Sequence, residues 1–258
     1  MTITSPDQLR AMSAAGEWRQ PTAGILDDFQ QANLVIVPQA LAWEVLLFCV
    51  RNPKVCPLLA VGEPGQAVIQ VGQTEVDVRS MLPRYRIWKQ GELVSEPWDL
   101  QQEWREDAVA FLLGCSHTFD GPLRRAGIPV SHAAPPVYIT QLACVPAGRI
   151  KGPMAVTMRP VLRQQLAVAT AVTARYASGH GMPVHYGDPT EIGISDLNRP
   201  DFGVFPGLSE DQVPVFWACG VTPQILLPPL QPEWLCSHYP GHMLVLDDRV
   251  DYFSLQHS

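Results

Sequence analysis

The spacing of apolar and polar residues along the chain predicts short strands that alternate with helices. Helices are expected where apolar residues recur every three or four positions between capping signals, over 5–15, 38–51, 99–114 and 162–176. Apolar and β-branched runs predict strands over 34–37, 57–61, 154–158, 213–217 and 243–246, and a hairpin over 84–94. This alternation is typical of an α/β fold with a mixed sheet and flanking helices.

The segment 99–114 carries the strongest of these helix predictions. Trp104, Ala108, Phe111 and Leu112 would share its inner face, and Gly114 would end it.

The hairpin and the loop-rich middle of the chain predict a second, smaller α+β subdomain. Proline-rich breaks near 133–136 and near Pro200 suggest an inserted subdomain over 134–200. The main α/β domain would then be discontinuous, over 1–133 and 201–258. No internal repeat is visible in the sequence.

Charge and cysteine usage narrow the class of protein. The 258 residues carry a net charge of −7, and no run of Lys and Arg exceeds two. The chain therefore lacks the basic face that nucleic acids or anionic membranes require. The beginning of the sequence lacks the pattern of a secretory signal, and the apolar stretch 41–50 is too short to span a bilayer. Six cysteines without a Cys-x-x-Cys pair favour neither disulfides nor a zinc knuckle, so we expect a cytoplasmic protein.

Proline, with 25 residues, indicates many fixed loops, and candidate chemistry lies in them. Cys115 follows the segment that ends at Gly114, with His117 close by. A thiolate nucleophile needs such a neighbouring base or cation. The alternative is a small, buried cysteine beneath the turn.

A second loop contains His185 and Asp188, followed by Pro189 and Glu191. Asp188 has the features of a helix N-cap, which would explain it structurally. The same helix end would also place free N–H groups beside His185 and attract a substrate carboxylate.

Two further segments resemble ligand loops. Thr222 follows Cys219 and a glycine after a predicted strand, which is typical either of a ligand site or of an ordinary strand–helix connection. His238 and His242 are four residues apart, but the intervening Pro-Gly excludes the helical metal pair, so no metal is expected.

Arginines beside turns could bind a substrate carboxylate or close structural salt bridges; the candidates are Arg149 and Arg159. The chain has neither a glycine-rich phosphate loop nor a Gly-x-Ser-x-Gly elbow, so no nucleotide cofactor is expected.

Ten blocks in one order resemble the hydro-lyase family related to D-glutamate cyclase: 31–38, 47–57, 82–86, 111–116, 147–149, 158–160, 183–189, 199–203, 215–224 and 238–243. The resemblance implies a two-part α/β architecture and a hydro-lyase acting on a small carboxylic or amino acid. No cofactor is expected. Cyclisation of D-glutamate to 5-oxo-D-proline is the reaction linked to relatives. The chain departs from the family pattern at Ile139, Gln141 and 27–29, where an Arg, an Asn and a Pro-Gly-Tyr are expected. A different substrate would follow if that Arg binds carboxylate.

Together, these observations predict an enzyme with a small carboxylate substrate and leave a homo-oligomer open. The expected catalytic residues are His185, His238, Cys115 and Asp188. The expected substrate-binding residues are Arg149, Arg159, Asn33, Thr222, His242 and Asp201. The alternative is a non-catalytic small-acid binding or regulatory protein on the same scaffold.

Overall fold

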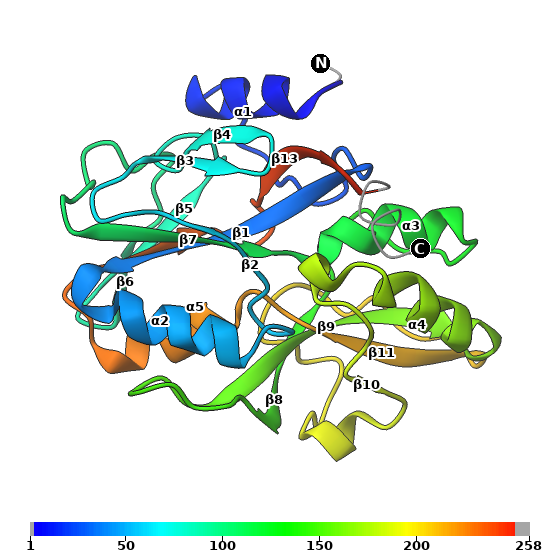
Figure 1. Cartoon of the computed structure of the whole chain (residues 1–258). Helices are drawn as coiled ribbons and strands as arrows, with labels where there is room; N and C mark the ends of the chain where they lie inside the picture. The colour runs from blue at the N-terminus through cyan, green and yellow to red at the C-terminus, as the bar shows by residue number, and fades with distance from the viewer. Residues whose placement is uncertain (1–2, 251–258) are drawn as a thin grey trace.

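Two sheets carry most of the strands in the computed structural model, which describes residues 3–250 (Figure 1). The larger sheet has the order β2-β7-β1-β12-β5-β6, and β13 also pairs with β1. Its strands are β1 (Phe29–Pro38), β2 (Leu58–Val61), β5 (Tyr85–Lys89), β6 (Glu92–Ser95), β7 (Ala108–Gly114), β12 (Leu235–His238) and β13 (Leu244–Arg249).

The smaller sheet has the order β10-β11-β9-β8. Its strands are β8 (Val137–Ala143), β9 (Pro153–Leu162), β10 (His185–Tyr186) and β11 (Gln212–Ala218). A separate hairpin is formed by β3 (Val68–Val71) and β4 (Thr74–Asp77).

Helices and the hairpin cover the sheets. The helices are α1 (Pro6–Ala14), α2 (Gln39–Arg51), α3 (Asp120–Arg125), α4 (Leu166–Ala174) and α5 (Thr222–Leu226). Short 3-10 turns are η1 (Ser116–Phe119), η2 (Arg163–Gln165), η3 (Ala177–Gly179), η4 (Pro189–Ile192) and η5 (Pro228–Leu230). Along β1, Leu34 and Ile36 face the hairpin side, whereas Val35 and Val37 pack with α2. Successive side chains of a strand point to opposite faces, so β1 is buried on both.

The α/β class is confirmed, and the expected mixture of strand directions needs correction. Every pairing recorded between the named strands is antiparallel. The helix α2 does return the chain so that β2 runs parallel to β1. However, β7 lies between them and pairs with both in the antiparallel sense. The strand–helix–strand order therefore predicted correctly that β1 and β2 run in the same direction. It did not predict that another strand lies between them.

The helix predicted over 99–114 is wrong. Residues 108–114 form β7, whose seven residues are all buried, and 99–107 form turns and irregular backbone. Ala108, Ala110 and Leu112 face one core, while Phe111 and Leu113 face the other. A strand buried on both faces has no alternation of apolar and polar residues, so its apolar run resembles a buried helix. The helix predicted over 162–176 is shorter than expected, because β9 continues to Leu162.

The structure contains a repeated arrangement that the sequence does not reveal. In each sheet a ten-residue strand leads into a helix, β1 into α2 and β9 into α4. The chain then adds a short strand, β2 or β10, to the far side of a long buried strand, β7 or β11. This arrangement depends on the direction and burial of the strands and does not require identical residues. Comparing the sequences of the two units therefore does not reveal the repeat.

The smaller sheet includes β11, which begins at Gln212, beyond residue 200. The division into domains at 134 and 200 stays a prediction. None of the helices formed by residues 3–250 combines the length and apolar character needed to cross a membrane.

Candidate active site

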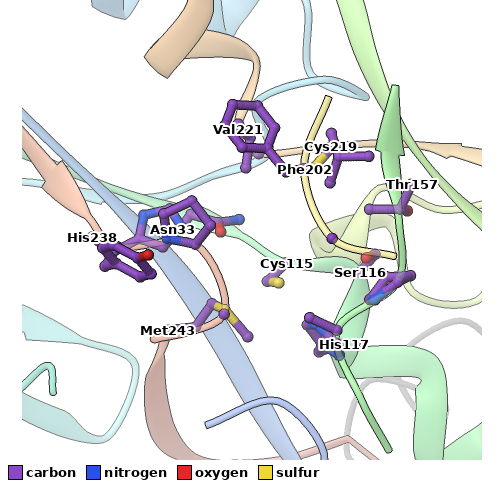
Figure 2. A pocket seen from close by; sticks show the side chains of 18 of the residues that line it. Asn33, Cys115, Ser116, His117, Thr157, Phe202, Cys219, Val221, His238 and Met243 are labelled. Carbon is purple, nitrogen blue, oxygen red and sulfur yellow. The ribbon is translucent and has the colours of Figure 1, made fainter. Parts of the chain in front are cut away.

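A cavity of about 250 Å³ lies where the ends of strands from both sheets meet. Its walls include Asn33 of β1, Arg86 of β5, Thr157 of β9 and His238 of β12. In Figure 2, Asn33 and His238 lie on one side and His117, Ser116 and Thr157 on the other, with Cys115 between them. Ligand sites of drug-sized molecules occupy roughly 300–1,000 Å³, so this cavity suits a smaller metabolite.

Two strand ends with the same local structure form part of the cavity wall. Cys115 follows β7, and Cys219 follows β11. In both turns the residue three positions on donates its main-chain N–H to the cysteine carbonyl, Thr118 at 3.1 Å and Thr222 at 3.0 Å. Each threonine Oγ1 also accepts a main-chain N–H from the neighbouring strand. These bonds fix both cysteine turns.

Close approach of the two sheets depends on glycine. A β-carbon at Gly220 would overlap the side-chain amide of Asn33. A β-carbon at Gly114 would overlap the carbonyl oxygen of Ser178. Gly114 and Gly220 therefore allow each cysteine turn to pack directly against a neighbouring segment of backbone or side chain.

A buried charged network lies behind one wall of the cavity. His117 Nδ1 lies 2.7 Å from one oxygen of Asp120, and Arg159 Nε donates to the other oxygen at 2.7 Å. Arg159 also donates to Thr157 and Ser116, each at 3.1 Å. All five side chains are buried.

The network determines which nitrogen of His117 is available. Burial alone would raise the pKa of Asp120, but the Arg159 guanidinium and the His117 ring outweigh burial and lower it. An ionised carboxylate only accepts hydrogen bonds, so Nδ1 of His117 must carry the proton that it shares with Asp120. Nε2 has no protein partner among residues 3–250, and His117 lines the cavity.

On the opposite side, His238 is held neutral by burial. Burial lowers the pKa of His238 to about 4. Its Nδ1 lies 3.1 Å from the Leu34 main-chain nitrogen, and the Gln224 side chain approaches to 3.4 Å. Asn33 beside it donates to the Gly114 carbonyl at 2.6 Å, which leaves its own side-chain oxygen without a partner in the described structure.

Arg86 supplies a positive charge at the cavity. Its Nε donates to Glu96 at 3.0 Å, and its guanidinium packs over the Tyr239 ring. Glu96 also binds Arg84 at 3.1 Å, so one carboxylate faces two guanidiniums. The two terminal nitrogens of Arg86 have no hydrogen-bond partner within 3–250. They can therefore bind a carboxylate in the two-pronged geometry that arginine favours.

Known proteins are similar to this chain over most of its length. The model of the family described as D-glutamate cyclase matches residues 109–247. A protein of Bacillus licheniformis named "Putative hydro-lyase" is 48% identical, with 97% of each chain covered. The chain belongs to the D-glutamate cyclase family.

Other relatives agree with this assignment. Proteins with the same printed name from Stutzerimonas stutzeri and Geobacillus kaustophilus are 48% and 46% identical over at least 94% of each chain. A solved nitrogen repressor-like protein from Methanococcus jannaschii matches with a TM-score of 0.43 and 11% identity, over 96% of this chain and 99% of that chain.

Three of the residues predicted for this family member line the cavity: Asn33, Cys115 and His238. Arg159 lies behind the wall and positions other side chains. Thr222 stabilises the Cys219 turn, and its hydroxyl is fully occupied by Cys219 and Ala155.

Two more lie beside the lining residues and make structural contacts. His242 is buried against the Tyr239 ring and bonds the Pro240 carbonyl at 3.1 Å. Asp201 accepts the main-chain N–H of Ile139 at 2.7 Å.

The remaining predicted residues are outside the cavity lining. His185 Nε2 bonds the Asp188 carbonyl at 2.8 Å, and Asp188 caps the exposed turn η4 through Thr190. The interpretation of Asp188 as an N-cap is therefore confirmed. Arg149 is exposed and binds Glu44 of α2. The structure does not bring these three side chains together with His238 or Cys115.

Three polar side chains of the site, Arg86, Ser116 and Asp120, were not among the predicted site residues, and His117 was considered only as a neighbour of Cys115. His117 and Asp120 are three residues apart. This spacing would have indicated a contact between them if the segment had been predicted as a turn. Arg86 carries no local signal, because its partner Glu96 lies across a hairpin.

No three His, Cys, Asp or Glu side chains of residues 3–250 are grouped as ligands for a metal ion. The donors at the cavity suit an organic acid: one guanidinium, imidazoles, amides and thiols.

Proposed function

We propose that this chain is a lyase that removes water from a small amino or carboxylic acid bound in the cavity between the sheets, with cyclisation of D-glutamate to 5-oxo-D-proline as the reaction. The proposal rests on the His117–Asp120 pair, whose histidine lines the same small cavity as Arg86 with its unpaired terminal nitrogens. The family and the printed names of its relatives support the reaction class.

Arg86 binds the α-carboxylate of the substrate. A charge-assisted, two-pronged bond to carboxylate is stronger and more directional than a neutral one. The aromatic ring of Tyr239 and the Glu96 carboxylate keep the guanidinium in place. Anchoring one end in a cavity of about 250 Å³ forces the amine and the γ-carboxyl group together.

His117 moves the proton during ring closure. The reaction starts from the neutral amine and the protonated γ-carboxyl group. The substrate nitrogen attacks the γ-carboxyl carbon and loses a proton to Nε2 of His117. The imidazolium is stabilised by Asp120, which is already bound to Nδ1. His117 then returns the proton to the departing oxygen, which leaves as water while the carbonyl reforms. Such general acid–base catalysis contributes about 10²–10⁴-fold in rate.

Main-chain donors support the negative charge that develops on the carboxyl oxygens. The N–H groups of Ser116 and Gly220 have no partner in the described part of the chain, and both residues line the cavity. Fixed N–H donors lower the barrier most where water is excluded.

The experiment is to incubate the purified chain with D-glutamate and to measure 5-oxo-D-proline by chiral chromatography. We expect enzyme-dependent product, and His117→Gln should reduce the rate by at least about 100-fold. Arg149→Met removes an exposed arginine outside the cavity and is the matched control, with an unchanged rate expected. If D-glutamate raises the melting temperature but no product forms, the result favours the non-catalytic alternative. If D-glutamate neither stabilises the protein nor reacts, it is excluded as the substrate.

A further inference from the structure

Two cysteines occupy equivalent positions in the repeated arrangement, and both line the same cavity. Cys115 follows the buried strand of the larger sheet, and Cys219 follows the buried strand of the smaller one. The cavity therefore has a thiol from each sheet. The mechanism proposed above uses neither.

The surroundings of the two thiols also correspond. Burial raises the pKa of Cys115 to about 12 and that of Cys219 to about 11. In both cases the main-chain N–H two residues on, from His117 or Val221, lowers the pKa. The Arg159 guanidinium lowers both as well. Both cysteines are therefore thiols in the free protein. Burial, a main-chain N–H and Arg159 act on the pKa of each of them.

A pair of thiols reaching one cavity from two sheets can act on one carbon atom from two sides. Proton transfer by a pair of cysteines needs one thiolate to remove a proton and one thiol to supply another. Asn33 and Thr157 line the cavity at equivalent positions of β1 and β9, opposite Leu113 and Trp217. The cavity thus combines two equivalent halves, as an inversion of configuration would require.

We propose that Cys115 and Cys219 form a two-base pair that inverts the α-carbon of glutamate bound in this cavity. This activity shares the cavity and the Arg86 carboxylate contact with the proposed function, and rests on that contact, but requires no loss of water.

The step balances as a transfer of protons. One cysteine first gives its proton to Nε2 of His117 and becomes a thiolate. The Cα–H bond then breaks, its proton passes to the thiolate, and the electron pair is delocalised into the α-carboxylate. The opposite thiol donates its proton to the other face of the α-carbon. One thiol and one thiolate are present before and after, with their positions exchanged.

The test is proton NMR in D₂O with D-glutamate and L-glutamate as separate probes. The wild-type protein should replace the α-proton with deuterium and form the opposite enantiomer, which chiral chromatography measures. Cys115→Ser and Cys219→Ser should each slow interconversion at least about 100-fold, while Cys144→Ser stays within about two-fold. Cys144 is a matched control, because it is a buried free thiol outside the cavity lining.

The single variants should also differ from one another. Each retains one thiol, so each should exchange the α-proton of only one enantiomer, and the two variants should prefer opposite enantiomers. A merely structural role of the thiols would not produce that opposite preference.

No α-exchange by the wild-type protein with either enantiomer would overturn the proposal, whatever the variants do. The proposal would also be overturned if Cys144→Ser lost as much α-proton exchange as Cys115→Ser and Cys219→Ser. The same spectra record 5-oxoproline, so the two proposals fail separately. Ring closure without α-exchange supports the lyase alone, and α-exchange without ring closure supports the thiol pair alone.

Discussion

Replacing Arg159 with methionine tests the buried network behind the cavity. The side chains of Arg159 and Asp120 are each only 3% exposed. The substitution removes the bond to Asp120 at 2.7 Å and the bonds to Thr157 and Ser116 at 3.1 Å. It also leaves the Asp120 carboxylate buried, with His117 as its one remaining side-chain hydrogen-bond partner among residues 3–250.

The magnitude follows from the orphaned charge. Removing one partner of a buried ion pair costs about 3–5 kcal/mol, because the remaining charge is neither solvated nor paired. For a chain of this size, that loss lowers the melting temperature by roughly 6–20 °C. Urea denaturation monitored by circular dichroism gives the free energy of unfolding.

The double variant Asp120→Asn/Arg159→Met is the control, since it removes the orphaned charge while keeping an amide for His117. It should recover a large part of the loss. A cost below about 1 kcal/mol for Arg159→Met, or a double variant less stable than the single one, would refute the reasoning.

The network also has a defined pH dependence. Asp120 has a folded-state pKa below its ordinary value. Its contribution is therefore fully present above the unfolded-state pKa of about 3.9 and is lost as pH falls through the lower folded-state pKa. Arg159→Met should reduce this acid-side slope.

Three further predictions concern single residues. Arg86→Met should raise KM for D-glutamate by at least about 10-fold, measured as initial rates against substrate concentration, and an unchanged KM would remove Arg86 from the site. His238 is neutral in the folded state with a pKa of about 4, so the folded protein loses stability as pH falls from the ordinary histidine value toward 4. His238→Gln should therefore flatten the melting-temperature profile over that window, and a profile as steep as that of the wild type would contradict the assigned burial effect. Gly114→Ala should cost several kcal/mol or abolish folding, because its β-carbon would overlap the Ser178 carbonyl, and soluble protein of wild-type melting temperature would contradict this packing.

Local signals in the sequence predicted several elements correctly. The helices predicted over 5–15 and 38–51 correspond to α1 and α2, and the hairpin predicted over 84–94 corresponds to β5 and β6. The segment 108–114 failed for a physical reason. A central strand buried on both faces lacks the polar positions that distinguish a strand from a helix.

Three predicted residues line the cavity, and they lie at different places in the strands. Cys115 follows β7, His238 ends β12, and Asn33 lies within β1. The His117–Asp120 contact depends on the turn after β7, which a predicted helix ending at Gly114 concealed.

His185 and Asp188 had the same local appearance as site residues. Their loop is held by its own hydrogen bonds away from the cavity. Whether a polar loop faces a cavity or solvent depends on long-range packing of the two sheets, which local sequence patterns do not contain.

The most direct test of the account is a crystal structure of the protein with bound 5-oxo-D-proline. We expect the ligand between the two sheets, with its carboxylate on the terminal nitrogens of Arg86 and its ring within hydrogen-bond reach of His117 Nε2. A ligand bound at the His185–Asp188 loop, or at the exposed Arg149, with the cavity left empty, would contradict it.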